Sequence, residues 1–199
     1  MRNIKEKRER SLGAKLFLKA DRCNSPKCVT VRRPQRPGQH GAKRQKNVTD
    51  FGRQWQEKQK IQIYFGLNNK QMQRLFSTDK ENISIQLRQR LDQVVYLLGF
   101  AKSPRIARQM VSHGHIKVNG RKVTIPSFHV SKGDVIEIRP ESRDSKLFEG
   151  IQERLKTWDV PKWMKLDAEK LQGECVASSN TDEYRFPFDI NLVGQFYSR

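Results

Sequence analysis

The sequence predicts an α+β protein whose clearest folding unit is a module of two helices, a β-hairpin and a further strand between residues 87 and 140. Apolar residues first recur there at three- and four-residue spacing, which is typical of helices, and then at every second position, which is typical of strands. Helix-start, helix-stop and turn residues fall at the matching places. Agreement among such local signals indicates an independently folding unit.

The first predicted helix is continuous and has one apolar face. Gly99 is its expected stop, because glycine tolerates the left-handed conformation that ends many helices. Its apolar face is formed by Leu87, Leu91, Val94, Val95 and Leu98.

The second predicted helix opens at Ser103 and Pro104, which suit an N-cap and a first helical position. Gly114 is expected to end it. Its apolar side is formed by Ile106, Ala107, Met110 and Val111.

A β-hairpin is predicted after the second helix. Residues 115–118 and 121–124 flank Asn119-Gly120, and both of these turn residues accept positive φ. A further strand, Val135 to Ile138, follows the turn at Lys132-Gly133-Asp134.

The charge pattern predicts an anionic partner for the first two thirds of the chain. The formal charge is +19, from 40 Lys plus Arg against 21 Asp plus Glu. The net charge is +13 for residues 1–60, +8 for residues 61–140 and −2 for residues 141–199. Nucleic acid is favoured over a membrane surface, because no apolar run approaches the roughly 18 to 20 residues of a membrane span.

The turn-rich stretch VTVRRPQRPGQHGAKRQKN (residues 29–47) carries many of the N-terminal cations. Its prolines and glycines oppose a helix, so we expect an extended, adaptable strip that tracks phosphates. A disordered basic tail without specific contacts is the alternative. The cations of this strip are Arg32, Arg33, Arg36, Lys43, Arg44 and Lys46.

The segment FAKSPRIARQMVSHGHIKVNGRKVTIPSFHVSKGDVIEI resembles the RNA-binding domain of the ribosomal protein S-four family, which also occurs in pseudouridine synthases and some tyrosyl-tRNA synthetases. CNSPKC, RRPQRPGQHG, EKQKIQIYFGLNNKQMQRLF, PKWMKLD and the terminal QFYSR resemble segments of the bacterial and organellar ribosomal protein, in its own order. The likeness covers nearly the whole chain.

The resemblance implies a mainly helical N-terminal domain with an inserted two-helix plus β-hairpin/β-sheet RNA-binding domain. The expected parts are a basic and helical region (1–86) with helices at Lys58–Ile63 and Asn69–Leu75, the RNA-binding domain (87–140), and a segment that packs back on the N-terminal domain (141–199). It also implies a non-enzymatic, non-homo-oligomeric constituent of the small ribosomal subunit. Its implied partners are a multi-helix junction in the 5′ domain of 16S-type ribosomal RNA, which it binds early in ribosome assembly, small-subunit protein five, and mRNA near the entry channel. A role in translational accuracy is implied too.

The expected RNA contacts are cations of the first two thirds with neighbouring imidazole and amide groups. For His40, a loop bend is the alternative, and His113 and His115 could instead cap a helix end. Trp55 is left open as a base-stacking platform, whereas Trp158, Trp163, Phe186, Phe188, Phe196 and Tyr197 are expected to anchor a core or an interface. The expected contacts are Arg32, Arg33, Arg36, His40, Lys43, Arg44, Arg53, Lys58, Lys60, Arg88, Arg90, Lys102, Arg105, Arg108, Gln109, His113, His115, Lys117, Asn119, Arg121 and Lys122.

No cofactor is expected. Cys23 and Cys28 have spacing acceptable for half of a zinc site, and some members of the resembled family complete such a site with two N-terminal cysteines that this chain lacks. Glu6, Glu9 or His40 could supply ligands, so zinc stays open behind a packed, reduced cysteine pair.

The rival class is an RNA-modifying enzyme or synthetase that carries the same domain. No Gly-rich phosphate loop, nucleophile elbow or HExxH motif is present, and Asp79, Asp92 and Asp134 suit capping or surface pairing. A stress-response RNA chaperone would not need the N-terminal strip. Three cysteines and a start without an apolar core indicate a reducing interior, and we expect a cytoplasmic ribosome, with an organellar one left open.

Overall fold

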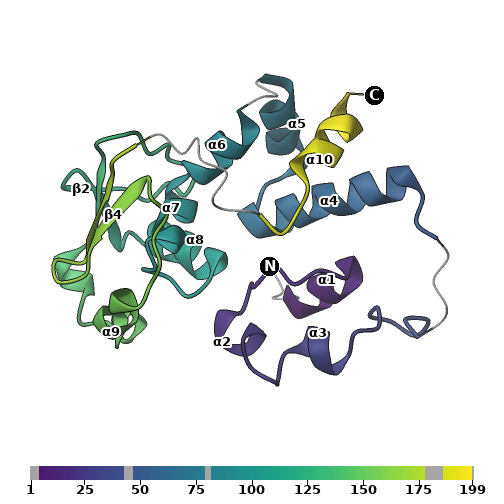
Figure 1. The fold of residues 1–199 in the computed structure, drawn as a ribbon, viewed down its shortest axis with the longest axis horizontal. Helices are drawn as coiled ribbons and strands as arrows, with labels where there is room; N and C mark the ends of the chain where they lie inside the picture. Colours follow the sequence, from purple (N-terminus) through teal and green to yellow (C-terminus); the bar gives the residue numbers. More distant parts are fainter. Residues whose placement is uncertain (1–4, 43–46, 79–81, 178–185, 199) are drawn as a thin grey trace. The chain divides into compact units, whose positions relative to one another are not determined.

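The computed structural model describes residues 5–42, 47–78, 82–177 and 186–198. The chain divides into two compact units (Figure 1). The helical unit contains residues 1–83 and 186–199, and the sheet unit contains residues 84–185. The predicted boundary at residue 140 is not where the units divide, since only the last part of the chain returns to the helical unit.

The helical unit is built around α4, a 16-residue helix over Asp50–Phe65. The Thr49 hydroxyl accepts from the Gly52 N–H at 3.2 Å, and Gly66 ends the helix at φ 61°. The other helices of this unit are α1 (Lys5–Leu12), α2 (Ala20–Cys23), α3 (Val29–Arg32), α5 (Asn69–Thr78) and α10 (Ile190–Tyr197).

The C-terminal helix α10 packs along α4 and α5. Tyr197 stacks on Phe76 with ring centroids 5.2 Å apart, and Phe188 packs edge-on against Tyr64 at 5.6 Å. Rings near the C-terminus therefore hold that end of the chain in the helical core, as predicted. The two helices implied by resemblance, at Lys58–Ile63 and Asn69–Leu75, lie within α4 and α5.

The strip begins in α3, and residues 33–42 then form turns and coil without a helix. The prolines and glycines explain the irregular part, as expected, but the prediction of an extended strip is wrong for Val29–Arg32, which precede the first proline of the strip and form α3. The Arg10 guanidinium donates to the Gln35 carbonyl at 2.9 and 3.1 Å, which fixes one point of the strip against α1. Residues 43–46 lie outside the described part of the chain.

The sheet unit contains a five-stranded antiparallel sheet in the order β2-β1-β3-β5-β4. Strands β4 and β5 come from the near-neutral third of the chain, which explains why much of it belongs to this unit. The elements are α6 (Ile83–Arg88), α7 (Leu91–Leu97), α8 (Pro104–Ser112), β1 (Ile116–Val118), β2 (Arg121–Lys122), β3 (Val135–Ile138), two 3₁₀ turns (Pro140–Ser142 and Lys146–Phe148), α9 (Ile151–Lys156), β4 (Met164–Asp167) and β5 (Gln172–Cys175).

The predicted caps and turn of the module are confirmed. The Ser103 hydroxyl accepts from the Ile106 N–H at 3.3 Å, with Pro104 as the first residue of α8. Asn119 and Gly120 have φ of 50° and 74°, so the β1–β2 hairpin uses the left-handed turn that this residue pair favours. Gly99 and Gly114 also have positive φ just beyond α7 and α8.

The prediction of one continuous helix from Leu87 to Leu98 is wrong, because the helix is interrupted between α6 and α7. Arg90 is extended and bridges to His129, while the Leu91 N–H donates to the Phe128 carbonyl at 2.9 Å. The Val130 N–H donates to the Gln89 carbonyl at 2.8 Å. Backbone partners from residues 126–130 thus replace helical hydrogen bonds, a long-range effect that apolar spacing cannot reveal.

The apolar core of the sheet unit lies between the sheet and α7, α8 and α9. A Cβ atom at Gly173 of β5 would collide with the Leu98 side chain, so α7 sits directly against the strand. Trp163 is buried, and the Trp158 indole N–H donates to the Leu97 carbonyl at 2.9 Å, which confirms both as anchors. Among the described residues, no helix is long and apolar enough to span a membrane.

Candidate nucleic-acid interface

Helix α8 separates its apolar and polar residues cleanly. Ala107, Met110 and Val111 are buried in the core, whereas Gln109 is exposed. Arg105 and Arg108 are half-buried and share the outer side of the helix with Gln109, at three- and four-residue spacing. Helix packing therefore leaves two arginines and one glutamine at least partly accessible to solvent.

The β1–β2 hairpin adds further cations to the sheet unit. Lys117 and Lys122 are cross-strand partners, so their side chains share one face of the sheet. Lys122 also lies against the end of α8, since a Cβ atom at Gly114 would collide with its Cε atom. We call the residues that line this region the α8–hairpin surface: Arg105, Arg108, Gln109, His113, Lys117, Arg121 and Lys122.

The charge on the outer face of the sheet changes sign from one edge to the other. Cross-strand pairing aligns one residue of each strand in a single row. An anionic partner is therefore attracted to the hairpin edge, whereas at the β4 edge Asp167 pairs with Lys170 and Lys165 lies on the same face. From edge to edge the row reads Lys122, Lys117, Glu137, Gln172 and Asp167.

Two predicted contacts, Arg90 and Arg108, share one carboxylate inside the protein. Arg90 makes two hydrogen bonds with Asp92, at 2.9 and 3.1 Å, and Arg108 makes one at 3.3 Å. The Asp92 side chain is only 6% exposed, and the Arg108 side chain is 37% exposed. Arg90 therefore serves the fold, whereas Arg108 is both anchored and accessible. Arg88, another predicted contact, is buried.

Asn119 braces its own turn. Its amide donates to Asp134 at 2.8 Å, and its carbonyl oxygen accepts from the Val135 N–H at 2.9 Å. Asp134 also accepts from the Ser131 N–H at 2.7 Å, in agreement with the turn role expected for this acid. The hydrogen bonds of the Asn119 side chain thus hold β1 to β3.

The two histidines at the end of α8 differ in their surroundings. His113 is exposed, whereas the His115 Nδ1 lies 3.0 Å from the Ser142 hydroxyl and its ring packs edge-on against Phe148. Burial, reinforced by the neighbouring charges of His113, Arg139 and Lys122, lowers the pKa of His115 below its usual value. His115 is therefore neutral at neutral pH and adds no cation to the surface.

The predicted contacts of the helical unit are also of two kinds. Arg32, Arg33, His40 and Arg53 are exposed, and Arg36 is half-buried. Lys43 and Arg44 lie outside the described residues, and Lys102, in the sheet unit, is exposed.

Lys58 and Lys60 are engaged inside the helical unit. The Lys58 ammonium lies 4.5 Å from the ring centroid of Phe196, and burial lowers its pKa. Lys60 forms an ion pair with Glu57, one turn away on α4. These two lysines hold α4 and its surroundings together, a role that the sequence pattern did not predict.

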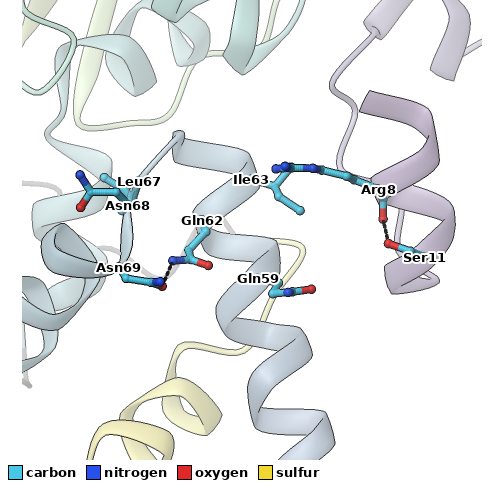
Figure 2. Close-up of a pocket in the computed structure, with 8 residues that line it drawn as sticks. All are labelled: Arg8, Ser11, Gln59, Gln62, Ile63, Leu67, Asn68 and Asn69. Atoms are coloured by element: carbon cyan, nitrogen blue, oxygen red, sulfur yellow. Dashed lines mark hydrogen bonds between the residues drawn. The ribbon is translucent and has the colours of Figure 1, made fainter. Parts of the chain in front are cut away.

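Residues of α1 and α4 that the sequence reasoning missed line a hollow in the helical unit (Figure 2). Arg8 of α1 reaches toward Ile63 of α4 in Figure 2, and Gln59 and Gln62 of α4 also line the hollow. Segment 5–12 contains four basic residues at near-helical spacing, and this pattern could have identified α1 as part of a basic site.

Cys23 and Cys28 are both buried near Glu9. The Glu9 carboxylate accepts from the Leu16 and Leu18 N–H groups at 2.9 and 3.3 Å, and Glu6 pairs with Lys19 and Arg22. Burial raises the pKa of the Cys23 thiol. Within the described ranges, no three His, Cys, Asp or Glu residues are grouped to hold a metal ion.

Comparison with known families matches two models to the chain. The S4 domain model matches residues 89–136, which span α7, α8, β1 and β2 and end within β3. The model of the ribosomal protein S4/S9 N-terminal domain matches residues 1–95. The first of these matches contains the whole α8–hairpin surface.

Curated relatives match nearly end to end. Small ribosomal subunit protein uS4 of Halothermothrix orenii is 43% identical over 94% of this chain and 93% of its own length. The proteins of the same name from Thermus thermophilus and Caldicellulosiruptor bescii are 41% and 43% identical over the same shares. At this identity and coverage, the chain belongs to the uS4 family of small ribosomal subunit proteins.

Proposed function

We propose that this chain is a structural, non-enzymatic constituent of the small ribosomal subunit that binds ribosomal RNA through the α8–hairpin surface and the exposed cations of its N-terminal strip. The observation that carries the proposal is the coincidence of the S4 domain match with a basic surface of five Lys and Arg side chains. Membership of a ribosomal protein family supports the subunit assignment and counts against the enzyme alternative.

The RNA target proposed is a multi-helix junction in the 5′ domain of 16S-type RNA. Double-stranded RNA hides its base edges in a deep, narrow groove, so a protein recognises it through phosphates, 2′-hydroxyls and shape. The chain has basic residues in two separate compact units, and each unit binds a different helix of the junction. Binding then favours the folded junction over open forms, which is what an early assembly protein must do.

Three finer assignments rest on the family resemblance. One copy of the chain contacts small-subunit protein five, lies near the mRNA entry channel and contributes to translational accuracy. The charge of residues 141–199, net −2, supports protein contact for this part of the chain over RNA contact. The two acidic residues of the sheet row, Glu137 and Asp167, lie away from the hairpin edge and support the same division.

We also propose that Cys23 and Cys28 pack as reduced thiols and hold no zinc. The carboxylates that could complete a site already have partners: Glu9 caps two backbone N–H groups, and Glu6 pairs with Lys19 and Arg22. A structural zinc site requires four ligands, so a cysteine pair alone would bind the ion weakly.

Two measurements test the proposed function. Sedimentation of extracts should show stable co-migration of the chain with small subunits. Binding to isolated 5′-domain RNA should weaken when Arg121 is changed to Gln, with a salt slope reduced by about one. Lys165→Gln, the same charge change on β4 at the other edge of the sheet, is the matched control. Equal binding by both variants and the unaltered protein would exclude the hairpin as the RNA-binding edge.

A further inference from the structure

The helical unit contains a hollow of about 550 Å³ whose lining is mostly polar (Figure 2). It lies beside α1, the second half of α4 and the start of α5, all in the same compact unit. This size suits a small organic group rather than a single ion. The lining residues are Arg8, Ser11, Gln59, Gln62, Ile63, Leu67, Asn68 and Asn69.

Amide side chains dominate the lining, and the fold holds several of them in place. The Gln62 amide donates to the Asn69 side-chain oxygen at 2.7 Å. Asn68 and Gln71 cap each other, with bonds of 3.0 and 2.8 Å between side chain and backbone N–H. Gln59 is half-buried, and its side chain makes no hydrogen bond to another residue in the described part of the chain. The hollow thus offers amide donors and acceptors on a fixed frame.

Arg8 is the one charged residue of the eight that line the hollow. Its side chain reaches from α1 toward Ile63 of α4 (Figure 2). Its guanidinium pairs with no carboxylate among the described residues, whereas Arg22 is paired with Glu6. Ile63 and Leu67 add aliphatic surface. A flat, neutral ring system that is joined to one negatively charged group fits this combination of side chains.

We propose that the hollow takes one unpaired nucleotide of the ribosomal RNA, with its base against the amides of Gln59 and Gln62 and its phosphate at Arg8. Amide side chains pair with the donor and acceptor edges of a base, and guanidinium groups bind phosphate. Ribosomal RNA is read in sequence-specific detail mainly where bases are splayed out of helices, as such a hollow requires. This inference rests on the proposed function, since it names a base contact within the RNA complex.

The test is base-specific chemical probing of 5′-domain 16S-type RNA, alone and bound to the full chain. Gln59→Glu removes the amide donor and adds a negative charge at a position that makes no internal hydrogen bond. Gln73→Glu, the same change on an exposed residue of α5 outside the hollow, is the control. In the unaltered complex we expect at least one unpaired base to be protected. Gln59→Glu should expose that base and weaken affinity about tenfold, whereas Gln73→Glu should do neither.

Unchanged base reactivity and affinity with Gln59→Glu would overturn the nucleotide contact while the proposed RNA binding stands. Failure of the unaltered chain to bind the RNA would overturn the proposed function first. Gln59→Ala guards against misfolding, because it removes the amide without adding charge. If Gln59→Ala gives a native circular dichroism spectrum, the variant is folded, and the same base should again become reactive in its RNA complex. Continued protection of that base would contradict the inference. A hollow filled by another ribosomal protein would leave the isolated RNA–protein complex unaffected by all three variants.

Discussion

The Arg108 guanidinium lies 3.3 Å from the Asp92 carboxylate, so an ion pair joins α8 to α7 behind the basic surface. Arg90, at 2.9 Å from the same carboxylate, completes the group. A buried carboxylate that holds two guanidinium groups fixes where the exposed part of Arg108 points. Asp92 is thus a positioning residue for the α8–hairpin surface.

Asp92→Asn should destabilise the sheet unit by about 3 kcal/mol, because it removes the charge of a buried carboxylate that pairs with two guanidinium groups. The free energy of unfolding should be measured in urea by tryptophan fluorescence in a Trp55→Phe background, which leaves only Trp158 and Trp163 of the sheet unit as reporters.

Asp144→Asn is the control for this experiment, since Asp144 is an exposed acid of the same unit. Its effect should stay within about 0.5 kcal/mol. Equal stabilities of the two variants would show that the Asp92 ion pairs contribute nothing to the fold.

Alanine substitutions at Gly114 and Gly120 form a matched pair that tests whether the position of Lys122 matters for RNA binding. Both have φ of 74°, so alanine at either place should cost about 1 kcal/mol of stability through backbone strain. Only at Gly114 would the new methyl group displace Lys122, since Gly120 faces open space. Gly114→Ala should therefore weaken RNA binding more than Gly120→Ala, at similar cost in thermal stability. The reverse order of affinities would place Lys122 outside the interface.

His115 should make the stability of the sheet unit depend on pH. Its folded-state pKa lies below the unfolded value of about 6.5, so the unfolded chain binds more protons as the pH falls through that value. Stability should therefore decrease between pH 7.5 and 5.5. His115→Gln should show a smaller decrease in the free energy of unfolding over the same interval. An identical decrease in both proteins would mean that His115 titrates alike when folded and unfolded.

Metal content tests the cysteine assignment. Protein purified without chelator should contain zinc well below one ion per chain, and added chelator should leave the unfolding midpoint unchanged. Burial raises the pKa of Cys175 to about 12, so this thiol should also resist alkylation until the protein unfolds. One tightly bound zinc ion per chain would contradict the proposal that Cys23 and Cys28 only pack.

Local signals predicted much of the sheet unit. Ser103-Pro104 and Asn119-Gly120 act through their immediate neighbours, so a cap and a turn could be read from a few residues. The interruption of the helix at Arg90 could not be predicted from nearby residues, since its backbone partners lie near residue 128. Strands β4 and β5 were missed for a similar reason: β5 is held by pairing with β3, about 35 to 39 residues earlier in the chain, and β4 is held by pairing with β5.

The candidate site divides in the same way. Composition located the basic surface, and helical spacing placed Arg105, Arg108 and Gln109 on the outer side of α8. Composition could not distinguish Arg121, which is exposed, from Arg88, which is buried. Composition also could not show that the Asn119 side chain makes its hydrogen bonds within the protein, because these depend on the position of Asp134 across the turn.

The most direct test of the account is the affinity of the full chain for folded 5′-domain junction RNA, measured as a function of salt concentration. With six or more phosphate contacts, affinity should fall about a thousandfold between roughly 50 and 200 mM salt. At the higher concentration, an unstructured transcript of equal length should bind at least about tenfold more weakly than the junction. An affinity that hardly changes with salt, or equal binding of both RNAs, would contradict recognition of a folded RNA by this basic surface.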